Sequence, residues 1–493
     1  MSKIDQFSNR WGIVLASLGM AIGAGNLWRF PRLAGQYGGA FIILWIVFLL
    51  IWSIPLLMAE FSIGKKYRKG VIGSMGLVAG KKLTWFGFFI TICTLGIAFY
   101  YSVVTAWALR YLGFAFGSTF SPDSFLTDSD SLNNFWKSVS TGSYITVGLY
   151  ILVIILGVLV LSKGVQKGLE KANRVLIPSL FVLLVIIAVV ALLMPKGILG
   201  LEYMFNVDFT LFSEPKIWIE ALSQSAWSTG AGWGLMMTLS SYSRDNEEIP
   251  LNTFIGAFGN NTASLLAGIA IIPAVFALAA SESDALNFLQ AGNQALTFTV
   301  IPALFGQIPG GSVLSIVFFS ALSMAAFTSL LSMIELMIRN LLDLDISRKK
   351  TILWVVILFT VLGFPSAFSL DVFNNQDWVW GLGLILSGFF ILIAVIRYGP
   401  VTFKKELIDS DADLSVWNNY FKWSINGSLL LAIVLLYWWM SRGYSDYPWF
   451  DEKGNWHLFD VYSNATILTQ WLLVIIIGMV FNNYLYEKFA KKS

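Results

Sequence analysis

The stretch Trp11–Gly39, which reads WGIVLASLGM AIGAGNLWRF PRLAGQYGG, decides the fold. It begins as an apolar helix and then meets Gly19, Gly23 and Gly25 in close succession. Because glycine inside a helix costs roughly 1 kcal/mol against alanine, this spacing predicts a break. Within a bilayer the freed carbonyls and amides need partners, which a cation or an anionic solute group can provide. The stretch therefore predicts a site halfway across a membrane; the alternative is that the glycines only allow close helix packing.

The composition is that of a protein that crosses the membrane many times. Of the 493 residues, 57% are hydrophobic and 12% are charged, whereas soluble proteins carry about 25% charged residues. The single cysteine, Cys93, excludes an intrachain disulfide, and the single histidine, His457, argues against a zinc enzyme or a histidine proton relay. The basic residues lie in short loops, so we expect no nucleic-acid partner.

Hydropathy and loop charge predict the number of spans and their orientation. A helix needs about 20 apolar residues to cross the hydrocarbon core, and basic residues gather in every second loop, as in Gly64–Lys82 and Lys163–Arg174. Because positively charged loops remain in the cytoplasm, we expect a multi-pass plasma-membrane protein with both termini cytoplasmic. The twelve predicted spans are roughly 11–35, 39–62, 83–113, 144–162, 170–194, 218–242, 253–281, 312–340, 350–368, 378–396, 418–440 and 466–487.

A second glycine cluster lies five spans after the first. Gly230-Ala231-Gly232 repeats the pattern of Gly23-Ala24-Gly25. Glycine-interrupted helices at corresponding positions of two halves indicate an inverted-repeat transporter. Two outer loops also favour local helices, at Leu126–Lys137 and Asp284–Thr297, and the second is either a lid that folds inward or a connector.

The segment Gly25-Asn26-Leu27-Trp28-Arg29-Phe30-Pro31 resembles the neurotransmitter:sodium symporter family, which includes amino-acid, GABA and monoamine carriers and the bacterial leucine transporter. The resemblance extends over nearly the whole chain. Its further motifs are Tyr100-Tyr101 with Trp107, Gly168 and Pro178 (where span 5 of the family unwinds on its inner side), Gln224 with Ser228, Asn260 with Ser264, and Thr328-Ser329.

The resemblance implies an all-α polytopic membrane protein with twelve transmembrane helices. Two five-helix inverted repeats, with helices 1 and 6 broken, are followed by two peripheral helices. The implied divisions are a cytoplasmic segment (1–10), the first repeat (11–194, spans 1–5), the second repeat (218–396, spans 6–10), and spans 11–12 with a cytoplasmic tail (417–493).

Two sodium sites are implied by the resemblance. One combines the carbonyls of Gly19, Ile22 and Ala325 with the hydroxyls of Thr328 and Ser329. The other combines the Ala21 carbonyl, Asn26, Ser228, Asn260 and the substrate carboxylate, so that sodium and substrate complete each other's coordination. Taken alone, Thr328 and Ser329 have another reading, since such hydroxyls in membrane helices usually bond to a carbonyl one turn back.

A chloride site is left open by the resemblance. Chloride-dependent members carry a neutral serine in span 7, and this chain has Ser264 there. The tyrosine that the family places in span 2 is replaced by tryptophan, whose indole N–H has a different geometry. The residues of this site would be Trp45, Gln224, Ser228, Asn260 and Ser264.

Charged residues inside predicted spans are functional candidates because they are costly in a membrane. Arg29 and Asp377 resemble the outer gate pair that closes above the substrate. Asp343 resembles the inner-gate aspartate, but the arginine that usually pairs with it is absent near the N-terminus. Lys3 or Arg10 is the candidate substitute.

The resemblance also implies the residues of the substrate pocket. Tyr101 and the amides around Gly25 would receive a carboxylate, and Gly23 stands where monoamine carriers have an aspartate. Trp233 is larger than the phenylalanine of the leucine transporter, which favours a small substrate, unless the indole packs away from the pocket. The implied lining is Ala21, Ala24, Gly25, Ile97, Tyr101, Trp227, Ser228, Gly230, Trp233, Ser329 and Met333.

Together these patterns predict a sodium-coupled importer of neutral amino acids, small ones such as glycine or alanine, that works by alternating access. An enzyme is not expected, since the spans contain no nucleophile–base pair. The alternatives are a carrier of a betaine-like or larger hydrophobic amino-acid substrate, and a channel or receptor with the same fold. The partners expected are the amino acid, sodium and the lipid bilayer, and the sequence does not predict an oligomeric state.

Overall fold

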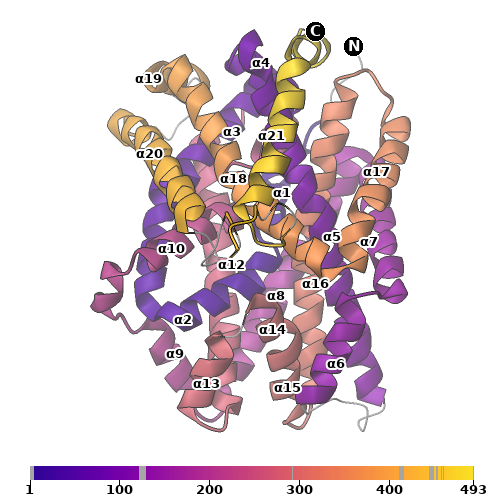
Figure 1. Ribbon diagram of the computed structural model, residues 1–493, viewed down its shortest axis with the longest axis vertical. Coiled ribbons are helices and arrows are strands. Elements are labelled where there is room, and N and C mark those ends of the chain that lie inside the picture. The colour runs from indigo at the N-terminus through magenta and orange to yellow at the C-terminus, as the bar shows by residue number, and fades with distance from the viewer. Residues whose placement is uncertain are drawn as a thin grey trace.

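The computed structural model describes residues 5–120, 129–290, 292–409, 416–442, 449–450, 453–456, 458 and 460–491, and Lys3 and His457 lie outside these ranges. The described chain is helical apart from loops and one isolated bridge between Phe450 and Trp456. Most of its length lies in helices that run along the long axis of the molecule (Figure 1).

Twelve spans can be followed along the chain. They are α1 (Arg10–Ala21) with the first part of α2 (Ala24–Phe48); the rest of α2 with η1 (Leu49–Ser53) and α3 (Ile54–Tyr67); α5 (Thr84–Phe120); α7 (Tyr144–Ser162); η4 (Val165–Glu170) with α8 (Lys171–Leu193); α10 (Pro215–Thr229) with α11 (Leu235–Ser240); α12 (Ile249–Leu278); α16 (Gly311–Leu342); α17 (Arg348–Phe368); α18 (Leu370–Tyr398); α20 (Asn418–Arg442); and α21 (Asn464–Val480).

Fewer than twelve described helices are long enough to cross a bilayer without interruption. Nine are, or ten if α21 and the bent segment after it form one span. The halves of the first and sixth spans are each too short, and α2 continues into the second span through a kink. At this kink Gly38 has φ 56°, and a Cβ there would lie 2.8 Å from the Asn206 carbonyl oxygen, so glycine is required.

The two predicted helix breaks are confirmed. Between α1 and α2, Ile22 and Gly23 have extended backbone. Between α10 and α11, Gly230, Gly232 and Gly234 have φ of 72°, 91° and 74°, a region that glycine enters without steric cost. The buried carboxylate of Glu60 accepts a hydrogen bond from the Gly232 amide at 2.6 Å, and so satisfies part of the unwound backbone.

Span 5 is wound at its inner end in this structure. Val165–Glu170 forms the π-helix η4, which continues directly into α8. A Cβ at Gly168 would lie 2.2 Å from the Val160 carbonyl oxygen, so glycine allows η4 to pack against α7. The inner unwinding that the resemblance associates with Gly168 and Pro178 is thus absent from this described segment.

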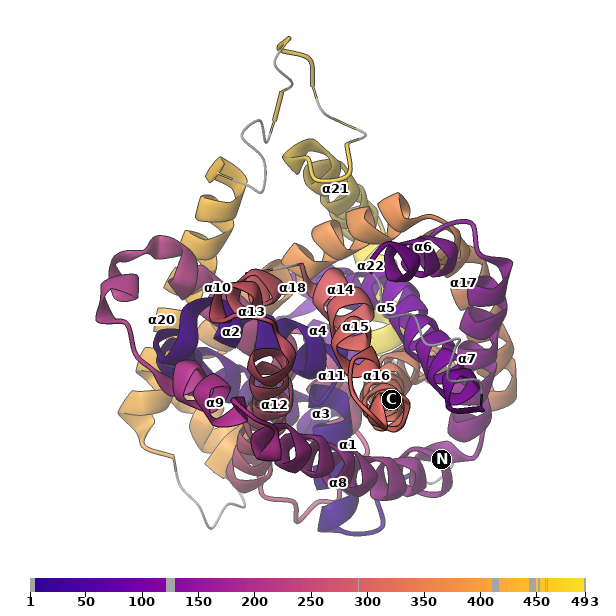
Figure 2. The same cartoon turned by 90° about the horizontal axis from the view of Figure 1, so that it is seen from below.

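The helices that hold the breaks lie inside the bundle. Seen from below, α11 and α16 lie toward the middle, whereas α7, α8, α9 (Gly197–Phe205) and α20 lie at the rim (Figure 2). The outer faces of α7 and α8 expose aliphatic side chains, such as Leu159 at 55% and Val182 at 59%. Those faces suit contact with lipid, and the buried interior contains the polar groups.

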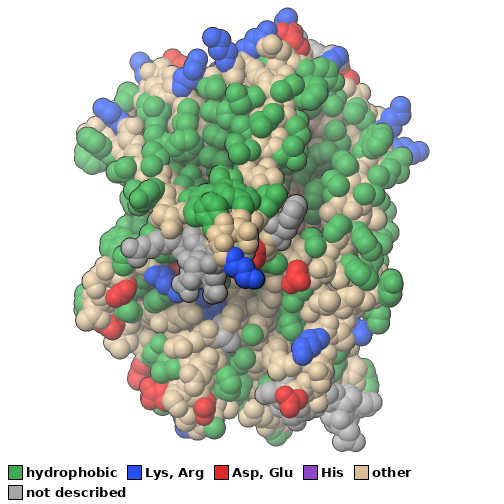
Figure 3. All heavy atoms as spheres, in the orientation of Figure 1, with side chains coloured by type: hydrophobic (Ala, Val, Ile, Leu, Met, Phe, Trp, Pro, Cys, Tyr) green, Lys and Arg blue, Asp and Glu red, His purple; other side chains and the backbone are tan. Residues whose placement is uncertain are grey.

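The two ends of the molecule differ in charge. Both termini lie at one end (Figure 1), and lysine and arginine side chains gather there on the visible face (Figure 3). The helices α6 (Ser129–Ser140), α13 (Glu282–Gln290) and α15 (Ile301–Gly306) lie at the opposite end (Figure 1). The described part of the first predicted loop helix is α6, and residues 126–128 lie outside the described ranges.

The second outer loop folds inward. It continues from α13 through α14 (Asn293–Ala295) and η6 (Leu296–Val300). Phe298 is fully buried and stacks on Trp136 with the ring centroids 5.1 Å apart. Of the two alternatives for this loop, the structure shows the one in which it packs as a lid. The remaining described helices are α4 (Val71–Val78), η2 (Lys81–Leu83), η5 (Phe209–Ser213), α19 (Pro400–Phe403), η7 (Lys404–Ile408), α22 (Asn482–Leu485) and η9 (Tyr486–Ala490).

Candidate sodium and substrate sites

The two interrupted helices meet around a cavity of about 70 Å³. The residues predicted to form the substrate pocket all line it except Ala24 and Ile97, which are fully buried beside it. A single water needs about 10–15 Å³, so the cavity has room for roughly five to seven water-sized groups. The lining comprises Met20, Ala21, Gly23, Gly25, Asn26, Trp28, Arg29, Tyr100, Tyr101, Gln224, Trp227, Ser228, Gly230, Trp233, Leu235, Asn293, Ser329, Met333 and Asp377.

One wall of the cavity is suited to a carboxylate. The Ala24 amide, at the start of α2, donates to the Tyr101 hydroxyl at 2.7 Å, and a Cβ added at Gly25 would meet open space. The amides at the N-terminus of a helix attract anions. A Cβ at Gly23 would lie 2.5 Å from the Tyr101 hydroxyl and 2.9 Å from the Ser329 Oγ, so an aspartate does not fit there.

The ligands implied for one sodium site lie together between α1 and α16. The Ser329 hydroxyl lies 3.1 Å from the Gly19 carbonyl oxygen and 3.3 Å from that of Ile22. The Thr328 hydroxyl lies 3.0 Å from the Ala325 carbonyl oxygen and the same distance from that of Met324. For Thr328 these contacts are the alternative of bonding one turn back, since both carbonyls belong to its own helix, whereas the Ser329 hydroxyl points across to α1.

The ligands implied for the other sodium site bring oxygen atoms unusually close. The Asn260 Oδ1 lies 2.8 Å from the Ser228 carbonyl oxygen and 3.1 Å from that of Ala21. Turning the amide over would make its nitrogen a donor to both carbonyls; with the oxygen in place, a cation among the three oxygens would relieve their repulsion. The Asn26 Oδ1 accepts from the Gly23 amide at 2.9 Å. The donor set fits sodium.

The residues considered for chloride leave hydrogen-bond donors unused. The Asn26 Nδ2 donates hydrogen bonds to the Asn260 Oδ1 and to the Ser264 hydroxyl, each at 2.8 Å. Both polar atoms of Gln224 and the Trp45 Nε1 are buried without a partner among the described residues. Donors left free in a buried region fit an anion.

Two indoles form another wall of the cavity. Trp227 and Trp233 lie edge to face, with ring centroids 5.2 Å apart and planes at 89°. Trp233 is 3% exposed, and its backbone is fixed because its carbonyl accepts from the Thr94 hydroxyl at 2.6 Å. A Cβ at Gly230 would lie 3.2 Å from the Met20 Cε. Both Trp233 and Gly230 therefore limit the size of the cavity.

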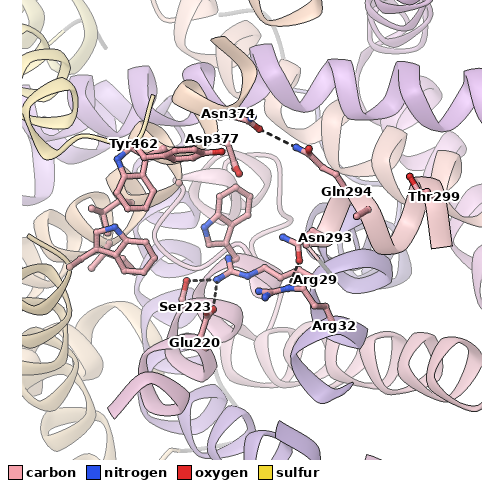
Figure 4. A pocket seen from close by; sticks show the side chains of 18 of the residues that line it. Arg29, Arg32, Glu220, Ser223, Asn293, Gln294, Thr299, Asn374, Asp377 and Tyr462 are labelled. Atoms are coloured by element: carbon pink, nitrogen blue, oxygen red, sulfur yellow. Dashed lines mark hydrogen bonds and ion pairs between the residues drawn. The ribbon is translucent and has the colours of Figure 1, made fainter. Parts of the chain in front are cut away.

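A second cavity of about 420 Å³ lies next to the first, and Arg29, Trp227, Asn293 and Asp377 line both. Arg29 and Asp377 lie on different sides of it (Figure 4). The guanidinium of Arg29 bonds to Glu220 at 3.2 Å and to Ser223 at 2.9 Å. The residues of the expected outer gate pair are thus brought to one vestibule, in which Arg29 is paired with Glu220.

The inner end of the molecule is held by contacts that the sequence did not predict. Asp343 pairs with Arg339 at 2.9 Å in its own helix and accepts from the Gly70 amide at 2.7 Å. Burial raises the pKa of the Asp343 carboxyl, although Arg339 and the Gly70 amide act in the opposite direction. Arg339 thus occupies the place for which Lys3 or Arg10 was the candidate, and Lys3 lies outside the described residues.

Comparison with known proteins decides the family. The family model described as "Sodium:neurotransmitter symporter family" matches residues 4–127 and 130–490. The chain belongs to the sodium:neurotransmitter symporter family. The symporter is 30% identical over 446 residues to an uncharacterised sodium-dependent transporter of Methanocaldococcus jannaschii, covering 88% of this chain and 90% of the relative. It is therefore a sodium-dependent transporter of the membrane, and not an enzyme.

Other similar proteins have names that include a substrate. The symporter is 27% identical over 299 residues to the sodium-dependent neutral amino acid transporter B(0)AT2 of Bos taurus, covering 56% of this chain and 40% of that one. Its structure is similar to that of MhsT in complex with L-phenylalanine, with a TM-score of 0.75 and 26% identity. This similarity covers 88% of the symporter and 99% of MhsT, in agreement with the predicted fold of twelve helices with an inverted repeat.

Some residues of the cavity were not among those predicted. Asn293 lines both cavities and accepts from the Arg32 Nε at 2.6 Å. Its position in a loop of undecided role was the only signal in the sequence. Leu235 and Trp28 also line the smaller cavity. Leu235 directly follows a glycine-containing motif and Trp28 lies within one, so lining residues could have been sought at both positions.

Proposed function

We propose that this symporter imports a small neutral amino acid, such as glycine or alanine, together with sodium. The observation that carries the proposal is the cavity of about 70 Å³ bounded by the start of α2, Tyr101 and the two indoles. The helix N-terminus and the Tyr101 hydroxyl suit the carboxylate. The remaining space suits a side chain of the size of a methyl group or a hydrogen.

Two sodium ions would bind at the oxygen clusters described above. One ion would sit at Ala21, Asn26, Ser228 and Asn260 and take the substrate carboxylate as a further ligand, which couples the two solutes. The other would sit between Gly19, Ile22, Ala325, Thr328 and Ser329. The convergence of the Ala21 and Ser228 carbonyls on the Asn260 side-chain amide supports the first site, and the convergence of carbonyls on Ser329 supports the second.

We also propose how the chain is oriented in the membrane and where its repeats begin and end. We place the symporter in the plasma membrane with both termini in the cytoplasm, which the basic end of the molecule supports. The repeats would comprise residues 11–194 and 218–396. Arg29 and Asp377 would act as the outer gate, and Asp343, held by Arg339, would act at the inner gate.

The direct test is uptake of labelled glycine and alanine into proteoliposomes that contain the purified protein. An inward sodium gradient should drive accumulation above the external concentration, and dissipating the gradient should abolish it. Flux that only equilibrates the amino acid would indicate a channel, and binding without flux would indicate a receptor. Accumulation of betaine or leucine in preference to glycine and alanine would favour the alternative substrates.

Chloride is a second part of the proposal, carried by the unused donors of Gln224 and Trp45. The substitution Ser264→Glu would place a fixed negative charge where the anion is expected. We expect uptake by the parent to fall when gluconate replaces chloride, and uptake by the variant to be indifferent to this exchange. A parent that transports equally well in gluconate would contradict the chloride site and leave the sodium sites untouched.

A further inference from the structure

The contact between α1 and α8 contains a buried amide with no partner. Asn173, in the first turn of α8, is 0% exposed. Neither its Oδ1 nor its Nδ2 has a hydrogen-bond partner among the described residues. An unpartnered buried polar group costs free energy, and such groups in a native protein call for an explanation. The amide therefore points to a ligand that arrives at a different step of the transport cycle.

Asn173 lies directly behind the second sodium site. A Cβ added at Gly19 would be 2.5 Å from the Asn173 Oδ1 and 3.2 Å from its Nδ2, so the amide packs on the Gly19 backbone. The carbonyl of Gly19 is one of those that converge on Ser329. Glycine at this position is what allows the amide to lie next to a proposed ligand of the ion.

Nearer the inner end, the same contact contains a carboxylate. Glu170, one turn before Asn173, is 2% exposed. Its Oε2 would lie 2.8 Å from a Cβ added at Gly12, which is two turns before Gly19 on α1. Two glycines of α1 thus face two oxygen-bearing side chains of span 5, in the same order along both helices.

The N-terminal segment covers the inner end of this contact. Glu170 accepts hydrogen bonds from the Ser8 amide at 2.8 Å and from the Ser8 hydroxyl. It also forms an ion pair with Arg174 at 2.7 Å. At the other end of η4, the Asp5 carboxylate accepts from the Val165 amide at 2.5 Å. Both ends of the π-helix are therefore tied to residues 5–8.

We propose that Asn173 is a transit ligand for sodium, which takes the ion from the Gly19 carbonyl as it leaves the second site and passes it toward Glu170. The inference rests on the sodium site proposed above at Gly19 and Ser329. Amide and carboxylate oxygens suit a hard cation. A buried cation that loses its ligands before water reaches it is high in free energy. An oxygen that takes the place of a lost ligand therefore lowers the barrier to release.

The test compares the rate of sodium release with the affinity for sodium. The full-length protein in detergent is loaded with radioactive sodium and saturating alanine, then diluted into sodium-free buffer that contains alanine. We expect Asn173→Leu to slow dissociation roughly tenfold, the scale of one polar contact to an ion, with an unchanged equilibrium Kd for sodium. Asn173→Asp, which keeps an oxygen at this position, should release sodium as fast as the parent.

Two controls separate this role from a general effect on packing. Thr351→Val, on α17, removes a different buried polar group, a hydroxyl with no partner among the described residues, and should leave both the rate and the Kd unchanged. Asn173→Ala should slow sodium dissociation as much as Asn173→Leu does. It therefore provides the same measurement if the protein with leucine at this position fails to fold.

Three outcomes would be informative. Release from Asn173→Leu and Asn173→Ala at the parent rate would overturn the proposal. A Kd weakened in proportion to the rate would also overturn it, because Asn173 would then only support Gly19. A parent that binds no sodium would instead refute the sodium sites of the proposed function.

Discussion

At the scale of single residues, Gly23 shows how a missing side chain sets the class of substrate. The space beyond its α-carbon is taken by the Tyr101 hydroxyl and the Ser329 Oγ. An aspartate there would displace both, and with them a proposed sodium ligand. Under the proposed function, a substrate that brings its own carboxylate would therefore suit this site better than an amine that needs a carboxylate from the protein. The sequence identified the glycine, and the structure identifies the atoms that exclude a larger residue.

Trp233 should determine the upper size limit of the substrate. A methylene in an apolar pocket is worth only about 1–3 kcal/mol, so Trp233→Leu should weaken uptake of glycine and alanine modestly. The same variant should gain uptake of leucine and methionine, because the cavity grows where the indole was. Competition assays with a panel of amino acids measure both effects. A parent that already prefers leucine to alanine would show that Trp233 does not limit size.

The paired hydroxyls of α16 should be essential for coupling to sodium. Thr328→Ala combined with Ser329→Ala leaves only carbonyls at the second site, so sodium-dependent uptake should collapse while the thermal unfolding temperature remains close to that of the parent. The matched control, Ser315→Ala with Ser323→Ala, removes two hydroxyls of the same helix that have no partner in the described part of the chain. This control should transport normally. Normal transport by the double variant at low sodium would refute the site.

At the scale of helices, glycine spacing predicted where spans 1 and 6 break, because φ above zero and close backbone contacts leave few other choices. The inner end of span 5 could not be predicted in the same way. Its motif is compatible with wound and unwound forms, and the π-helix η4 is held by contacts with Asp5 and Ser8, which are distant in sequence. A local pattern does not contain such contacts.

The lid formed by α14 and η6 should depend on Arg32. Its Nε donates to the Asn293 Oδ1 at 2.6 Å, and Asn293 borders both cavities. Arg32→Ala should raise the apparent KM for substrate a few-fold, since a partly exposed contact of this kind is worth about 1 kcal/mol. Lys137→Ala, which removes an exposed charge from α6, is the control and should leave the KM unchanged. An unchanged KM in Arg32→Ala would show that the lid is held by Phe298 instead.

At the scale of the whole molecule, the described residues form a vestibule on one side of the smaller cavity and a close contact at the other end. The vestibule of about 420 Å³ leads to the smaller cavity. At the other end, the Phe7 amide donates to the Tyr242 carbonyl oxygen at 3.1 Å, and Phe7 is 2% exposed. In the orientation proposed above, access from the outside with a closed inner end is one of the two states that alternating access requires.

Introduced cysteines should report this asymmetry, because the only native cysteine, Cys93, is fully buried. In sodium, Thr299→Cys, which lines the vestibule, should react with a membrane-impermeant maleimide. Ser17→Cys, on α1 against Met236 of α11, should be protected. Adding sodium and alanine together should slow labelling at 299 and increase labelling at 17. Equal labelling at both positions in sodium alone would contradict the closed inner end.

The sequence predicted the architecture better than the partners of individual charges. Span number, the two breaks and the membership of the pocket follow from hydropathy, glycine spacing and family motifs. The pairing of Asp343 with Arg339, and of Arg29 with Glu220, depends on side-chain placement within the folded bundle. The fully buried Asn173 likewise became notable only when its neighbours were known.

The edge-to-face pair of Trp227 and Trp233 gives the wall of the pocket an optical property of its own. Two indoles with ring centroids 5.2 Å apart and planes at 89° are close enough for their electronic transitions to couple, which gives rise to a paired signal in the near-ultraviolet circular dichroism spectrum. Under the proposed function, a substrate that enters between α2 and these rings should change their relative orientation, and so alter the signal without any added label. Other indoles of the chain also lie in close pairs, such as Trp107 with Trp136 at 4.9 Å, so only the part of the spectrum that changes on substrate addition would report occupancy of the site.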